Sequence, residues 1–362
     1  MLTPKAKRNI GRILPFGIIW MVLGWIFLTI EIAAIGETGQ VQETAIKLTV
    51  PIFIYASIAV GVVGCLVGAI EVIYLNAVFS KYSFFVKILA KLIIYSFILF
   101  FIILITFPIA ASMELNTSVL DPGVWEKYVK YLYSITYLST NLQLSVSLVA
   151  SLFYSEISDK VGQRVLLNFF VGKYHRPKYE TRIFMFADMK SSTTIAEKLG
   201  HVRYFELLNE YYNDFSDSII NTLGEVYQYI GDEIVISWTL DRGLKNAYCI
   251  QCYREVKSQL RSRAEWYQKA FDVQPDFKAG IHVGEVTTGE IGALKKEIIF
   301  TGDVLNTTAR IQGLCGELKE DLIISEDLMN HFEDRSNKAQ FRSLGTYQLK
   351  GKESDTHLYT ID

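Results

Sequence analysis

Cysteine and histidine are scarce in this chain, which limits the covalent and metal-based sites that it can build. Its 362 residues include four cysteines and five histidines. Cys249 and Cys252 form a CxxC pair, but zinc or redox chemistry would need a second pair or nearby histidines. Cys65 lies inside an apolar run and Cys315 is solitary. We therefore expect no disulfide framework and interpret the CxxC pair as a packing feature.

The histidines and the basic residues exclude two further classes of site. All five histidines lie outside the long apolar runs, so a haem held by two histidines within a membrane bundle is excluded. They are His175, His201, His282, His331 and His357. The formal net charge is −2, and no stripe of lysine and arginine indicates nucleic-acid binding.

Charge is distributed unequally along the chain. Residues 1–154 contain 10 Lys and Arg against 7 Asp and Glu, and the remaining residues contain 26 against 31. Long apolar runs dominate the first part, and the second has the composition of an ordinary globular domain. We expect a membrane domain at 1–154, a helical signalling linker at 155–180 and a catalytic domain at 181–362.

Four apolar stretches reach the length of about 20 residues that crosses a bilayer. They are Ile13–Ala34, Leu48–Tyr74, Ile88–Ala111 and Tyr133–Tyr154. The last is the most polar, since it contains Asn141 and Gln143. A cleavable signal peptide is an alternative for the first stretch, but its apolar run is long and lacks a small-residue cleavage site.

Lysine and arginine near the ends of these stretches predict their orientation. Basic residues precede the first stretch and separate the second from the third; they are Lys5, Lys7, Arg8, Arg12, Lys81, Lys87 and Lys91. We therefore expect an integral protein of the cell (inner) membrane with both termini in the cytoplasm. Glu71 and Lys91, near the cytoplasmic ends of adjacent spans, can pair with each other, although snorkelling to the interface explains both equally well.

The linker contains apolar residues at helical spacing, and Pro177 ends the pattern. The pattern comprises Val161, Val165, Leu166, Phe169 and Phe170. A bland connector and a parallel helix pair between two protomers that transmits a signal are both compatible with it.

The soluble part alternates strands and helices. We expect strands at 183–187, 226–230, 234–238, 277–283 and 286–291, with one long helix from Ser192 to Leu223, broken near Gly200, and a second from Gly243 to Phe271. The order βαββαβ implies a ferredoxin-like α+β core.

Two aspartates 44 residues apart stand where strands meet turns. Asp188 ends an apolar strand, and Asp232 follows Gly231 in a predicted hairpin. Two carboxylates that converge on one spot fit a divalent cation pair. Further along, Asn306 and Arg310 stand at i and i+4, so both project from one helix face.

This set of motifs resembles the class III nucleotidyl cyclases, which close ATP or GTP into a 3′,5′-cyclic nucleotide. The match runs from about Arg182 to Asp362 in the order FAD, a Ser/Thr-rich helix start, IGDEIV, a GIHVGEV hairpin, GDVLN and YQLKGK. The resemblance, which is to the membrane-anchored bacterial type, implies two Mg²⁺ or Mn²⁺ ions held by Asp188, Asp232 and the Met189 carbonyl. It gives Asn306 the role of orienting the ribose and Arg310 that of stabilising charge on the α-phosphate.

Other positions match the family's nucleotide contacts. The resemblance and the free N–H groups of a helix start give phosphate binding to Lys190, Ser191, Ser192 and Thr193, although simple N-capping by a serine also explains this segment. Lys350 matches the family's phosphate-binding lysine better than Lys352 does, and Asp303 is expected to cap the helix of Asn306.

The base-reading positions depart from the family pattern. Adenylyl members usually have Lys and guanylyl members Glu where this chain has Gln228, and the second reader aligns with Ile299. ATP is the expected substrate and GTP the alternative, because the guanylyl-type glutamate is missing.

Together these features predict a membrane-anchored adenylate cyclase that works as a homodimer, with the metal aspartates from one chain and Asn306 and Arg310 from the other. One rival is a membrane receptor whose cyclase-like domain only binds a nucleotide. Another is a channel or transporter with a soluble regulator, which the short loops and few intramembrane charges disfavour.

Overall fold

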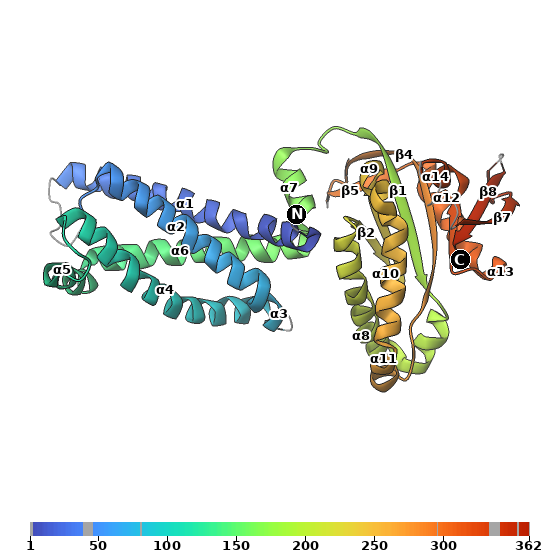
Figure 1. Cartoon of the computed structure of the whole chain (residues 1–362), viewed down its shortest axis with the longest axis horizontal. Coiled ribbons are helices and arrows are strands. Elements are labelled where there is room, and N and C mark those ends of the chain that lie inside the picture. The colour runs from blue at the N-terminus through green and yellow to red at the C-terminus, as the bar shows by residue number, and fades with distance from the viewer. Residues whose placement is uncertain are drawn as a thin grey trace. The chain divides into compact units, whose positions relative to one another are not determined.

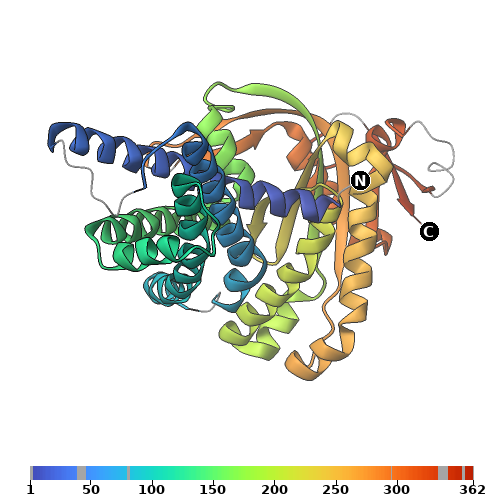
Figure 2. The same cartoon turned by 60° about the vertical axis from the view of Figure 1, so that its left-hand side comes forward.

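The computed structural model describes residues 3–38, 46–79, 82–294, 296–332, 341–352 and 355–361. The chain divides into two compact units, a helical unit at Ala6–Leu167 and an α/β unit that includes Asn168–Asp362. Figures 1 and 2 show the helices of the first unit and the sheet of the second.

The helical unit is built from long apolar helices. Its elements are α1 (Pro4–Thr38), α2 (Val50–Ile70), the π-helix η1 (Glu71–Leu75), α3 (Asn76–Val78), α4 (Phe84–Leu115), α5 (Pro122–Leu132) and α6 (Ile135–Val161). Three helical segments of the described residues have the length and composition of membrane spans: Pro4–Ala33, Val50–Leu75 and Phe84–Leu115. The first three predicted spans agree with these segments. The fourth falls on α6, which is 27 residues long but does not have the composition of a span.

Figures 1 and 2 show α1, α2, α4 and α6 side by side. Side chains from all four helices meet in one apolar core: Phe16, Trp20, Val67, Tyr95, Leu99, Leu148 and Leu152. Four of the six serines of α6 face inward, since Ser147, Ser151, Ser155 and Ser158 are all buried. Inward serines explain why α6 packs like its neighbours and yet has a more polar composition.

The predicted pairing of Glu71 and Lys91 is confirmed. The two side chains form an ion pair, and both are almost completely buried within the helical unit. The hydroxyl of Tyr95 donates to Glu71 Oε2 at 3.2 Å. Snorkelling alone therefore does not account for these charges.

The predicted linker is divided between two helices. α6 continues to Val161, and α7 occupies Gln163–Val171. Gly162 separates them with φ of 92° and ψ of 128°, a backbone conformation that residues with a Cβ rarely adopt. The apolar pattern is therefore interrupted at its start.

The α/β unit contains one mixed sheet. Its strands are β1 (Lys178–Met189), β2 (Glu225–Ile230), β3 (Glu233–Thr239), β4 (Phe277–Ile291), β5 (Glu297–Thr301), β6 (Leu322–Ser325), β7 (Phe341–Tyr347) and β8 (Thr356–Ile361). The order is β2-β3-β1-β4-β6-β8-β7, with β5 paired to β4. The first four strands are antiparallel, as the predicted ferredoxin-like core requires, and β6 joins β4 in parallel.

Helices cover both faces of this sheet. They are α8 (Ser192–Asn221), α9 (Leu240–Leu244), the 3₁₀-helix η2 (Lys245–Ala247), α10 (Tyr248–Ser262), α11 (Ala264–Phe271), α12 (Asp303–Gly313), α13 (Cys315–Leu318) and α14 (Glu326–Asn330). Alternate residues of β1 divide between the two faces. Ile183 and Met185 belong to the larger core with residues of α8 and α10, whereas Phe184 and Phe186 pack with Val304 of α12.

Three local predictions are wrong. The segment GIHVGEV is no hairpin, because β4 is one strand of 15 residues whose ladder to β1 continues through Gly284 and Glu285. The second long helix is divided, since Asn246 and Ala247 take left-handed backbone conformations. Asp303 is the first residue of α12 and not its cap, which is Gly302. The break of α8 at Gly200 is as predicted.

Candidate active site

Two adjacent antiparallel strands place Asp188 and Asp232 at the same end of the sheet. Asp188 lies opposite Glu233 in the β1–β3 ladder, so Asp232 precedes its register partner by one residue. Gly231 provides the turn before it with φ of 63°. The hydroxyl of Tyr212 on α8 donates to the Gly231 carbonyl at 2.8 Å and fastens this turn to the helix.

The electrostatics of the aspartate pair fit a cation site. Burial and then the negative charge of Asp232 raise the pKa of Asp188, while Lys278 acts in the opposite direction. Asp232 Oδ2 is buried and has no hydrogen-bond partner among the described residues. A buried, unpartnered carboxylate oxygen beside a second carboxylate is costly unless a cation binds there, so the residues present fit divalent ions.

Sequence reasoning missed two charged neighbours of this pair. Lys278 on β4 is the register partner of Asp188, and its Nζ lies 3.4 Å from Asp188 Oδ2. Glu233 follows Asp232, and burial, then the charges of Asp188 and Asp232, raise its pKa to about 7. The alternation of β3 could have placed Glu233 beside Asp188, but the register of β4 was not available from the sequence.

A cleft of about 490 Å³ adjoins this end of the sheet. It is lined by Asp188, Met189 and the turn into α8, together with α13 and Lys319. All the residues of the predicted phosphate segment therefore line one cavity: Lys190, Ser191, Ser192 and Thr193. Ser191 has a left-handed φ of 56° and makes no side-chain cap, so serine capping does not explain this helix start.

The backbone N–H and the side-chain amine of Lys190 already have partners in this structure. Its backbone N–H donates to the carbonyl of Asp276 at 2.9 Å, and its Nζ lies 2.7 Å from Asp276 Oδ2 and 2.5 Å from Asp321 Oδ1. Lys257 contacts the same two carboxylates. The N–H groups open to a phosphate thus belong to the first turn of α8 beyond Lys190.

Asn306 and Arg310 lie on α12, which packs closely on the sheet. A Cβ on Gly280 of β4 would lie 2.5 Å from the backbone nitrogen of Gln312, so only glycine permits this approach. Asn306 is exposed. Nη1 of Arg310 is buried and without a hydrogen-bond partner in the described part of the chain. The guanidinium of Arg310 keeps its positive charge, so its unused N–H donor can hydrogen-bond to an anion.

The turn that carries Lys350 lies beside Arg310. A Cβ built on Gly351 would be 3.4 Å from Nη2 of Arg310, so the turn backbone covers the guanidinium. Lys352 is 3.3 Å from Asp303 Oδ2, whereas Lys350 is exposed. This arrangement leaves Lys350, the predicted phosphate ligand, available.

The predicted site residues therefore form two groups on one chain. Asp188, Met189 and the start of α8 line the cleft, but Asn306, Arg310 and Lys350 do not. Both groups are present in one chain, and only the first lines this cleft.

Gln228 and Ile299 belong to strands that approach each other. The Phe300 backbone N–H donates to the Tyr227 hydroxyl at 3.4 Å, and the two rings are 4.8 Å apart. Gln228 is exposed next to this contact on β2, and Ile299 pairs with Gly289 on β4.

The thiols of the α/β unit are packing residues, as predicted. Cys249, Cys252 and Cys315 are buried and free, and burial raises the pKa of each thiol to about 12.

Comparison with known proteins places this site in a family. Residues 175–362, just over half of the chain, match the family described as adenylate and guanylate cyclase catalytic domain. Adenylate cyclase 2 of Rhizobium meliloti (strain 1021) is 33% identical over 201 residues, which cover 56% of this chain and 55% of that protein. Adenylate cyclase 1 of the same strain is 27% identical over 183 residues, or 49% of this chain and 27% of that protein. The chain thus spans about half, or less, of these relatives.

A solved structure of a bacterial light-regulated adenylyl cyclase has a similar fold. The comparison gives a TM-score of 0.53 at 22% sequence identity. It covers 63% of this chain and 65% of that chain.

Proposed function

Because the chain belongs to the adenylate and guanylate cyclase catalytic-domain family, we propose that it is a membrane-anchored adenylate cyclase that converts ATP to 3′,5′-cyclic AMP and pyrophosphate. In this reaction the ribose 3′-oxygen bonds to the α-phosphorus and the bond to pyrophosphate breaks. The observation that carries the proposal is the aspartate pair, with the unpartnered Asp232 Oδ2, beside a cleft that a helix N-terminus lines.

Asp188 and Asp232, with the Met189 carbonyl, would hold two Mg²⁺ or Mn²⁺ ions. Bound divalent cations would lower the pKa of the 3′-hydroxyl and neutralise the triphosphate. The aspartates fix the position of the reacting groups, and the first turn of α8 binds phosphate oxygens through its N–H groups.

Arg310 stabilises the charge that develops on the α-phosphate in the transition state, where a fixed cation has its largest effect. Asn306, four residues earlier on the same helix face, orients the ribose. Lys350, exposed in the turn that covers Arg310, binds the terminal phosphates.

The catalytic unit works as a homodimer with two equivalent shared sites. Asn306 and Arg310 do not line the cleft of Asp188, which supports a site completed by a second copy of the chain. A two-fold dimer brings the Asp188 group of each protomer to the Arg310 group of its partner.

ATP is the preferred nucleotide. Two relatives are named adenylate cyclases, and Gln228 replaces the glutamate expected of guanylyl enzymes. An amide presents both a donor and an acceptor, so discrimination against GTP is incomplete.

The helical unit anchors the enzyme in the cell (inner) membrane through four spans, with both termini in the cytoplasm. Among the described residues, three helical segments have the length and composition of a span, and α6 contributes the fourth because four of its six serines face inward while its length of 27 residues suffices. Residues 155–180 then join the membrane domain to the catalytic domain.

Turnover by the purified full chain in lipid nanodiscs tests the proposal. We expect cyclic AMP from ATP with Mg²⁺ or Mn²⁺, a slower product from GTP, and loss of both with Asp232→Asn. If the wild-type chain binds ATP but forms no cyclic product with either ion, the catalytic unit is a nucleotide-binding regulator and the proposal fails.

A further inference from the structure

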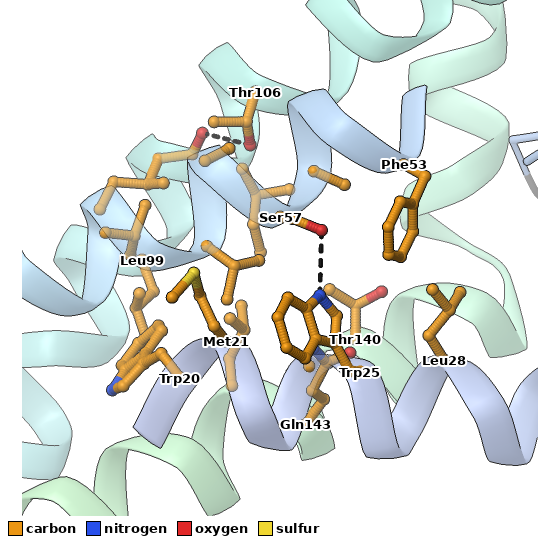
Figure 3. A pocket seen from close by; sticks show the side chains of 18 of the residues that line it. Trp20, Met21, Trp25, Leu28, Phe53, Ser57, Leu99, Thr106, Thr140 and Gln143 are labelled. Atoms are coloured by element: carbon orange, nitrogen blue, oxygen red, sulfur yellow. Dashed lines mark hydrogen bonds between the residues drawn. The ribbon is translucent and has the colours of Figure 1, made fainter. Parts of the chain in front are cut away.

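A partly open cavity of about 240 Å³ lies between α1, α2, α4 and α6 of the helical unit, and some of its lining residues, such as Trp25 and Phe53, are exposed. Figure 3 shows the side chains that line it. Most of the lining is apolar, including Trp20, Met21, Phe53, Val60, Leu99 and Leu144. The cavity is larger than the engineered cavity of about 150 Å³ that binds benzene in a protein core.

The cavity begins where close packing between α1 and α2 ends. A Cβ on Gly64 would lie 2.8 Å from the Trp20 ring, and one on Gly61 would lie 3.0 Å from Met21 Sδ. These glycines let the two helices approach closely. Residues 50–60 of α2 contain no glycine, and this segment contributes much of the cavity wall.

Polar groups line the cavity near Trp25 (Figure 3). Trp25 Nε1 donates to Ser57 Oγ at 3.0 Å, joining α1 to α2. The hydroxyls of Thr106 and Thr140 donate to carbonyls of their own helices, at 3.0 and 2.9 Å. These four polar side chains have partners.

Gln143 differs from them. Its side chain lines the cavity, is partly buried, and makes no hydrogen bond to the other residues drawn in Figure 3. An amide in an apolar environment is costly to leave unpaired, and a bilayer core supplies no water to pair with it. A ligand with a hydrogen-bonding group satisfies this amide.

The apolar lining disfavours a charged ligand of either sign, and Glu31, an exposed residue of the lining, adds repulsion against an anion. We propose that the cavity binds a neutral, mainly apolar small molecule of roughly ten heavy atoms, whose oxygen or amide group hydrogen-bonds to Gln143. The occupant is a diffusible molecule rather than an acyl chain of the bilayer, because a hydrocarbon chain has no group that can hydrogen-bond to Gln143. This binding does not depend on the proposed catalytic activity.

Photolabelling of the full chain in nanodiscs tests the proposal, with 3-azioctanol, a photoreactive neutral alcohol, as the probe. We expect saturable labelling of cavity residues, mapped by mass spectrometry, and displacement by 1-octanol. Octanoate at an equal concentration in the bilayer should displace the probe at least ten-fold less effectively, because Glu31 repels its carboxylate.

Two variants and one control locate the site. Ala59→Phe fills the cavity and should reduce saturable labelling at least five-fold, whereas Ile58→Phe, at the adjacent lipid-facing position outside the lining, should leave it unchanged. Gln143→Leu should weaken displacement by 1-octanol about five-fold, the value of one lost hydrogen bond, and leave displacement by n-octane unchanged.

Three results would overturn the proposal. The first is labelling that does not saturate or is equal in the Ala59→Phe and Ile58→Phe variants. The second is an unchanged effect of 1-octanol in Gln143→Leu, which does not depend on whether Ala59→Phe folds. The third is saturable labelling of the same residues by a phospholipid with a photoreactive acyl chain that 1-octanol fails to displace.

Discussion

Lys278 and Asp188 are register partners on neighbouring strands, and their side chains form an ion pair with Nζ 3.4 Å from Oδ2. The lysine therefore supplies positive charge to one of the two carboxylates that we assign to metal binding. A divalent cation that binds Asp188 must compete with it or displace it.

Lys278→Met should raise the affinity for Mn²⁺ without nucleotide about five-fold, since a partly exposed charge near the carboxylate opposes a cation by roughly 1 kcal/mol. Isothermal titration with Mn²⁺ measures this change. Lys198→Met, which removes an exposed lysine paired with Asp272, is the control and should have no effect. If the wild type, Lys278→Met and Lys198→Met bind Mn²⁺ with equal affinity, Lys278 does not oppose the metal.

The proposed shared site predicts complementation between two inactive chains. Asp232→Ala should remove metal binding from every site of its homodimer, and Arg310→Ala should remove transition-state stabilisation. In the mixed dimer one site carries both defects and the other carries neither. Random pairing makes half the dimers mixed, so co-expression should restore up to about a quarter of wild-type activity in a cyclic AMP assay.

The matched control for complementation co-expresses one chain that carries Asp188→Ala with another that carries Asp232→Ala. Both changes affect the same group, so every site lacks one metal ligand and activity should stay absent. If the first pair also stays inactive although the two chains co-purify, each protomer completes its own site.

Base selection should be loose. ATP should turn over faster than GTP, and Gln228→Lys should change the ATP:GTP ratio of kcat/KM because we assign base contact to this position. Val226→Lys, on the same strand and 38% exposed, is the control that adds the same charge away from the base. A wild-type preference for GTP, or an unmoved ratio in Gln228→Lys, contradicts the base-reading assignment.

The linker should control how the two catalytic units of a dimer meet. Inserting one to four residues near Gln163 rotates the following helix by about 100° per residue, so activity should vary stepwise with insert length. An insert of four glycines at the same place should break this dependence. Activity that stays constant over the helical series would make the linker a passive tether.

His282 should make the stability of the α/β unit dependent on pH. The ring is buried with Nδ1 2.8 Å from Ser325 Oγ, and burial lowers its pKa to about 4, against the attraction of Asp327. The unfolded chain, with an ordinary histidine pKa of about 6.5, binds the proton more readily below that pH. The contribution of neutral His282 to the free energy of unfolding is therefore fully present above about pH 6.5 and is lost as the pH falls towards 4.

Between pH 7 and pH 5 this histidine should lower the free energy of unfolding on the order of 2 kcal/mol. Hydrogen exchange of the β4 amides in the full chain, corrected for intrinsic exchange rates, measures the loss. His282→Asn should flatten the dependence, and His201→Asn, at an exposed position, should retain it. If His282→Asn keeps the pH dependence of the wild-type free energy of unfolding, other groups cause the effect.

Local signals were sufficient for the parts of the site that depend on one strand end or one turn. Gly231 and Asp232 identified the hairpin, and its position beside Asp188 follows from the fold. Lys278 was not predictable in this way, because it meets Asp188 only through the register between β1 and β4, 90 residues apart in sequence.

The hairpin error has a tertiary cause. Gly284 and Glu285 suggested a turn, but the ladder to β1 keeps β4 extended through both residues. Strand pairing therefore overrode local propensity there. The composition of α6 also depends on packing, because four of its six serines are buried against neighbouring helices.

The buried Glu71–Lys91 pair has a consequence for biogenesis. Each side chain alone would carry an uncompensated charge into a hydrophobic segment, which costs about 3 kcal/mol at the centre of a helix and less towards its end. Val50–Leu75 and Phe84–Leu115 hold one partner each and are joined by a short connection. The two segments are therefore best released by the insertion machinery as a helical hairpin, in which each charge neutralises the other before the surrounding lipid must solvate it.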